Sequence, residues 1–77
     1  MGASPQVGDT VPLEVLGRGR VDARVVRREE MDWHGIPGLA WRIQLELPDG
    51  TVADAMQIGE ERLTFLDPRH RVADPLP

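Results

Sequence analysis

Apolar and polar residues alternate with a period of two along most of this chain, which is the pattern of β-strands that bury one face. The clearest case is segment 39–47, "LAWRIQLEL". Segment 10–15 alternates in the same way, and Pro12 there has no N–H to donate, which indicates an edge strand or a bulge. Within segment 39–47, we predict that these side chains face a core: Leu39, Trp41, Ile43, Leu45 and Leu47.

Two more segments have strand character. In segment 20–28, the apolar residues at positions 21, 23 and 25 are predicted to share one face and the arginines the other. Segment 51–58 has no clear phase, because Asp54 shares a face with apolar residues, and we expect a bulge there. Between the third and fourth strands, "PDG" predicts a tight turn in which proline presets φ and glycine takes a positive φ.

The remaining signals complete a small all-β fold. "GEERL" predicts one helical or 3₁₀ turn, and "LTFL" after it predicts a short closing strand. Five short strands with one long connection between the second and third are typical of a small barrel. We therefore expect residues 7–66 to form the domain, residues 1–6 a flexible tail, and residues 67–77 a flexible, proline-rich tail.

Several stretches carry a resemblance to a known group of folds: "VGDTV", "GRGRVDARVV", "WRIQLELPDGTV" and "EERLTFL". In this order they resemble the SH3-like barrels of the Tudor and KOW kind, over about residues 7–66. The resemblance implies a five-stranded barrel with a 3₁₀ turn before the last strand. A five-stranded barrel of the OB type is the alternative fold.

Composition narrows the class of protein. The 77 residues suffice for one small domain with a thin core, and no cysteine is present to form a disulfide or a thiolate metal site. No apolar run approaches the length that spans a bilayer, and the N-terminus lacks the features of a signal peptide, so we expect a cytoplasmic protein and no membrane partner. All nine basic residues are arginine, which is typical of a GC-rich genome.

Arginines concentrate between residues 18 and 42, where they suggest a binding face. If the second and third strands pair, one outer face would carry Arg20, Arg24, Arg28 and Arg42. The KOW resemblance implies that such a face cradles phosphates. The favoured interpretation is that Asp22 and Glu46 form cross-strand ion pairs with these arginines. The net charge of −4 also disfavours a nucleic-acid partner.

Other chemistries have weak signals. The chain has three aromatic residues, and Trp41 and Phe65 are needed for the core, which argues against an aromatic cage for methylated side chains. His34 and His70 are isolated, are expected to be exposed, and have no second ligand at helical spacing. We therefore predict no catalytic residues, no metal and no cofactor.

One enzyme family offers a partial resemblance. "MQIG" is similar to the Val-Gln-Ile-Tyr run of type II dihydrofolate reductases, which are small SH3-like barrels with one active site built by four subunits. Gln57 and Ile58 match that run, but Gly59 stands in place of the tyrosine, and the lysine which that family uses is absent from the chain. A small oligomeric enzyme is therefore the least favoured alternative.

The segment 29–38 carries unusual apolar bulk for a connection. We expect Met31 and Ile36 to plug one end of the barrel, and Trp33 with His34 to be presented to a partner. The sequence thus predicts a non-enzymatic binding module for a protein partner or for a second copy of itself. Its predicted binding residues are Trp33, His34, Arg24, Arg28 and Arg42. A nucleic-acid-binding barrel is the alternative function.

Overall fold

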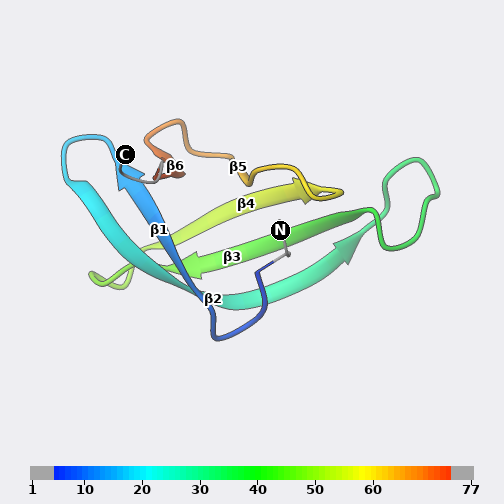
Figure 1. Cartoon of the computed structure of the whole chain (residues 1–77), viewed down its shortest axis with the longest axis horizontal. Coiled ribbons are helices and arrows are strands. Elements are labelled where there is room, and N and C mark those ends of the chain that lie inside the picture. Colours follow the sequence, from blue (N-terminus) through cyan, green and yellow to red (C-terminus); the bar gives the residue numbers. More distant parts are fainter. Residues whose placement is uncertain (1–4, 74–77) are drawn as a thin grey trace.

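The computed structural model describes residues 5–73, which form one antiparallel sheet that curls into a nearly closed barrel (Figure 1). The order of strands across the sheet is β5-β4-β3-β2-β1-β6, and the edge strands β5 and β6 contact each other. Every pairing is antiparallel. The strands are β1 (Thr10–Val15), β2 (Gly19–Met31), β3 (Ala40–Glu46), β4 (Val52–Ile58), β5 (Thr64–Phe65) and β6 (His70–Val72).

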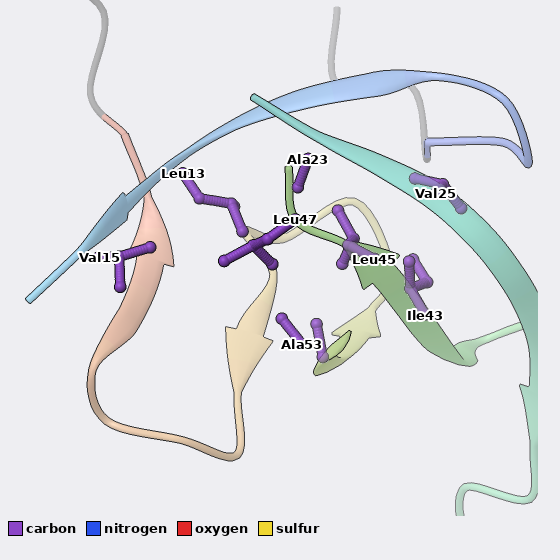
Figure 2. Close-up of a cluster of buried hydrophobic side chains, with 9 residues drawn as sticks. Leu13, Val15, Ala23, Val25, Ile43, Leu45, Leu47 and Ala53 are labelled. Atoms are coloured by element: carbon purple, nitrogen blue, oxygen red, sulfur yellow. The ribbon is translucent and has the colours of Figure 1, made fainter. Parts of the chain in front are cut away.

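The core lies inside the curve of the sheet and is built from small and branched side chains (Figure 2). Trp41 and Phe65 are only partly buried and pack against this cluster from the side. The inward positions predicted for segment 39–47 are therefore confirmed as buried at Ile43, Leu45 and Leu47, whereas Trp41 covers the core instead of filling it. The largest fully buried side chains are Leu13, Ile43, Leu45 and Val25.

The sheet has six strands, not the five that the sequence predicts. The sixth, β6, lies in the segment expected to be a tail, and it pairs with β1 so that Leu13 lies opposite Val72. Ala73, which follows β6, is buried and donates its N–H to the Pro12 carbonyl at 2.9 Å. Tail residues 1–4 and 74–77 lie outside the described residues.

Pro12 is accommodated although β1 lies inside the sheet between β2 and β6, which corrects the prediction of an edge or bulged strand. β6 pairs with β1 only over Leu13–Val15, so it ends just before reaching the position opposite Pro12. The N–H that proline lacks would have pointed to this side. Ala73 donates to the Pro12 carbonyl on this side, and the bond that residue 12 would return to Ala73 is the one that is missing, at the point where the pairing of β6 ends.

The register contains one bulge, and it lies in β2, not in the fourth strand where the sequence predicts one. Val25 lies opposite Leu45, but the next paired residue is Arg27, opposite Gln44, so that Val26 is the extra residue. β4 pairs regularly with β3. Its inner face carries alanines and Gln57, which is why apolar residues at its even positions gave a misleading phase.

The chain between β4 and β5 forms a turn and no helix, which corrects the prediction of a helical or 3₁₀ turn at "GEERL". Glu61 donates its N–H to the Ile58 carbonyl at 3.2 Å, a single reverse turn. The turn between β3 and β4 is confirmed as predicted, since Gly50 has a φ of 88° and donates to the Leu47 carbonyl at 2.9 Å.

Candidate functional site

The connection between β2 and β3 projects from the barrel as a compact loop over residues 32–39 (Figure 1). Hydrogen bonds within the loop define its shape: Gly35 donates to Asp32 Oδ1 at 3.2 Å, Ile36 donates to the Trp33 carbonyl at 3.0 Å, and Gly38 donates to Glu30 Oε2. His34, Gly35 and Gly38 have positive φ values of 53°, 71° and 73°. The loop is therefore held by one backbone hydrogen bond and by the carboxylates of Asp32 and Glu30, without support from the core.

The apolar side chains of this loop stay outside the core. Trp33 is half-buried and makes an edge contact with the exposed His34, with ring centroids 5.2 Å apart. Ile36 is 50% exposed, and neither it nor Met31 belongs to the core cluster or packs against it. The expectation that Met31 and Ile36 plug the barrel is wrong, because the loop projects from the barrel and neither side chain packs against the core (Figure 1).

We call residues 29–38 the hairpin tip; they comprise the last residues of β2 and most of the loop. An open hollow of about 440 Å³ lies on it, lined by Glu30, Met31, Asp32, Gly35, Ile36 and Pro37. Both acidic and apolar groups line this hollow. The hairpin tip therefore offers a surface that combines apolar area with negative charge.

The outer face of the sheet carries arginines that lie opposite carboxylates. Arg24 is exposed and lies opposite Glu46. Arg42 lies opposite Glu29 and donates to Asp54 Oδ1 at 3.3 Å. The ion pair of Arg42 runs across strands, but its partner is Asp54 and not the predicted Asp22 or Glu46. A face with such pairing favours balanced charge over phosphate binding.

Asp54 shows the electrostatic consequence of this pairing. Gln44 donates to Asp54 Oδ1 at 2.8 Å, and this hydrogen bond, with a further one from Arg42, holds the pKa of the Asp54 carboxyl below its usual value. The carboxylate is thus charged at neutral pH and offsets the positive charge of Arg42. A phosphate approaching this part of the sheet would meet both signs of charge.

Arg28 does not share that outer face, contrary to the prediction from the sequence. Beyond the bulge it lies opposite Ile43, on the inner face, and its guanidinium carbon lies 3.7 Å from the ring centroid of Trp41. Facing residues of an antiparallel pair share one side of the sheet, so the extra residue Val26 reverses the face that Arg28 would otherwise occupy. Arg28 and Trp41 form a cation–π contact.

The predicted binding residues therefore occupy three places. Trp33 and His34 lie together in the loop, Arg28 lies on the inner face, and Arg24 and Arg42 lie on the outer face. His70, predicted to be exposed in a tail, is half-buried in β6, and its ring lies 6.1 Å from that of Phe65.

Gln57 is a residue whose role the sequence did not reveal. It is 5% exposed, and its Nε2 donates to the Glu61 carbonyl at 2.9 Å, so it ties β4 to the following turn. Its spacing of two from Ala55 and four from Ala53 was a usable signal, since it places all three on one face. The side chain that resembled part of a reductase motif is engaged in supporting a turn.

Within residues 5–73, no three His, Cys, Asp or Glu side chains gather closely enough to hold a metal ion. Nor does that part of the chain contain a helix of the length and apolarity needed to cross a membrane. Comparison of the chain with models of protein families, with curated proteins and with solved structures gives no match.

Proposed function

We propose that this chain is a protein-binding module whose contact surface is the hairpin tip. The observation that supports this proposal is that Trp33 and Ile36 are held on an ordered loop but contribute nothing to the core. A loop needs no large apolar side chains to make its own backbone turns. Large side chains on a preformed loop lose little conformational freedom on binding, which is the property of anchor residues in interfaces.

The other functions have less support. Nucleic-acid binding would use the outer arginines, but Arg24 lies opposite Glu46, and Arg42 lies opposite Glu29 and donates to Asp54. The whole chain also has a net charge of −4. Binding to phosphates strengthens with each positive charge that replaces a counterion, and paired arginines in an acidic protein release few counterions. The reductase alternative relies on Gln57, whose amide donates to the turn after β4.

The test is the substitution Trp33→Ala, compared with Leu66→Ala as a control. Leu66 is 69% exposed and lies in the chain after β5, far along the sequence from the hairpin tip. Trp33→Ala is expected to leave the melting curve nearly unchanged and to weaken binding by about 2 kcal/mol, or roughly 30-fold in Kd. Binding is measured as self-association and as retention of proteins from an extract of the source cells.

Leu66→Ala is expected to leave both readings as in the parent. A large fall in melting temperature for Trp33→Ala, together with unchanged binding, would show that Trp33 stabilises the fold and is no anchor. That result would contradict the proposed function.

A further inference from the structure

One edge of β2 lacks a neighbouring strand over half of its length. β1 pairs with β2 only over Gly19–Arg24, and Val25 closes this pairing with bonds to Gly8 and Asp9 of 2.8 and 2.9 Å. From Val26 to Met31, β3 is the single strand beside β2 among residues 5–73. The side of β2 away from β3 is therefore an open sheet edge next to the hairpin tip.

The register with β3 determines which backbone groups point to this open edge. Leu47 donates to the Thr51 carbonyl at 2.8 Å across the β3–β4 turn, so the odd-numbered residues of this strand bond towards β4 and the even-numbered ones towards β2. The partners of the even-numbered residues beyond the bulge are residues 27, 29 and 31. Arg28 and Glu30 therefore direct their N–H and C=O groups away from β3, towards the open edge.

The same two residues carry opposite charges on the same face. Arg28 lies opposite Ile43 and Glu30 lies opposite Trp41, so both side chains belong to the inner face of the sheet. A second copy of the chain, laid antiparallel along this edge with Glu29 at the centre, brings Arg28 of each copy opposite Glu30 of the other. The pattern is thus complementary to itself.

Neighbouring registers lack this match. In a continuous sheet, the inner faces of both copies stay on the same side only if an alternative register differs from the proposed one by two residues. One such shift sets Arg28 against Arg28, and the other sets Glu30 against Glu30. Like charges directly opposite each other destabilise a strand pair, so the charges select the register centred on Glu29.

We propose that two copies of this chain associate through the open edge of β2, in the antiparallel register centred on Glu29. The pairing exchanges backbone hydrogen bonds between residues 28 and 30 of the two copies and keeps the contact of Arg28 with Trp41. It also forms two ion pairs, in which Glu30 uses Oε1, because its Oε2 accepts from Gly38. Glu29 faces its own counterpart on the outer face, where the ion pair with Arg27 in each copy reduces the repulsion. Charged residues on an edge also discourage pairing with unrelated strands.

This inference rests on the proposed function, since it names a second copy as the partner of the same hairpin. In the proposed register, the loop of one copy continues past Val26 of the other, which is 38% exposed, towards the turn that carries Val7, which is 62% exposed. Trp33 then contributes apolar contact at each end of the paired strands. The short edge indicates a small interface and a dimer with a dissociation constant in the micromolar range or weaker.

The experiment is sedimentation equilibrium of the full chain from micromolar to millimolar concentration. The parent is expected to dimerise, whereas Arg28→Glu alone and Glu30→Arg alone are each expected to weaken dimerisation by about tenfold or more. An equimolar mixture of these two variants is expected to form heterodimers, because every facing pair then carries opposite charges. Glu60→Arg makes the same change in charge as Glu30→Arg, outside this edge, and is expected to dimerise like the parent.

A second measurement covers the cases in which Arg28→Glu loses its contact with Trp41 and fails to fold, or Glu30→Arg alters the loop by removing the acceptor of the Gly38 N–H. Hydrogen exchange of the Glu30 amide in the parent is expected to slow as the protein concentration rises, while that of the amides in the turn between β3 and β4 stays constant. The proposal would be overturned by a parent that is monomeric at all concentrations, or by a hydrogen-exchange rate of the Glu30 amide that does not change with concentration. So would a mixture of folded variants that stays as monomeric as each variant alone.

The two proposals fail in different ways. A monomeric parent that still retains another protein through Trp33 would remove the edge pairing and leave the proposed function in place. A dimer that is unaffected by Trp33→Ala, with no other protein retained, would keep the edge pairing and remove Trp33 as the anchor.

Discussion

Arg28 and Trp41 illustrate what a strand pattern reveals and what it omits. The alternation of residues along segment 39–47 correctly indicated that Trp41 faces inward. Nothing in the pattern indicated that an arginine covers it, because the stacking of Arg28 depends on the bulge at Val26, two residues earlier in the same strand. Among the predicted binding residues, the positions of Arg24 and Arg42 followed from periodicity, and that of Arg28 did not.

The contact between Arg28 and Trp41 is expected to stabilise the fold measurably. We predict that Arg28→Met and Trp41→Leu, made singly and together, show a coupling free energy of unfolding of about 0.5–1 kcal/mol, as cation–π pairs at accessible sites do. Urea denaturation measures it. The control cycle combines Arg27→Met with Trp41→Leu. Arg27 lies on the outer face opposite Gln44, so the effects of these two substitutions on the unfolding free energy are expected to be additive. Equal coupling in both cycles would exclude a specific stacking energy.

The bulge in β2 explains why strands were easier to predict than their faces. The existence of the four longer strands followed from alternation and turn residues, whereas one extra residue at Val26 reversed the side on which later residues lie. Residues 24–28 around it are two valines and three arginines, and nothing in this run indicates the position of a β-bulge. Local sequence predicts pairing partners poorly when both alternatives bury similar side chains.

Deleting Val26 is expected to leave the fold intact. Removal of this residue makes the pairing between β2 and β3 regular while Val25, Arg27 and Arg28 keep their present faces and hydrogen-bonding directions. We predict a loss of unfolding free energy of about 1 kcal/mol or less, measured by urea denaturation, since Val26 is partly exposed and outside the core.

Deletion of Ala23 is the matched comparison for this prediction. Ala23 is fully buried in a regular part of the same strand, so its loss shifts neighbouring residues to the wrong face and is expected to abolish folding. A chain without Val26 that also fails to fold would show that the bulge itself is required for the curvature of the sheet.

Closure of the barrel by β6 was the feature of the fold that was hardest to predict from the sequence. The strand β6 is three residues long and follows a proline, so it reads as part of a tail, yet it covers the free edge of β1. A short strand with one buried neighbour has little periodicity of its own, and its place in the sheet depends on contacts with β1, more than 50 positions away along the chain. Its turn is held by Asp67, whose carboxylate accepts hydrogen bonds from the side chain and the backbone of Arg69; these bonds lower the pKa of Asp67 to about 2.

A chain that ends at Leu66 is therefore expected to be severely destabilised. It loses the pairing of β6 with β1, the bond from Leu16 N–H to the Arg69 carbonyl of 2.8 Å, and the packing of Val72 against the core. Full burial of a valine contributes about 1.5–3 kcal/mol, of which the partly buried Val72 supplies a part, and a domain of this length has only about 4–12 kcal/mol in total. Thermal and urea denaturation measure the loss, and a chain that ends at Ala73 is the control. Equal stability of the two chains would support a domain that ends at residue 66, as the sequence predicts.

The positive φ values in the loop after β2 have a consequence for how this chain tolerates change. Gly35 and Gly38 touch nothing that a Cβ would meet, yet a side chain at either position would be strained at φ values of 71° and 73°. Trp33 and Ile36 are large, but the loop's shape does not depend on them. The usual order is thus reversed in this loop, where the smallest residues resist substitution and the largest are free to vary. Selection for a new binding preference can therefore change Trp33 and Ile36 with little loss of stability, because the glycines that the loop's conformation requires stand at other positions.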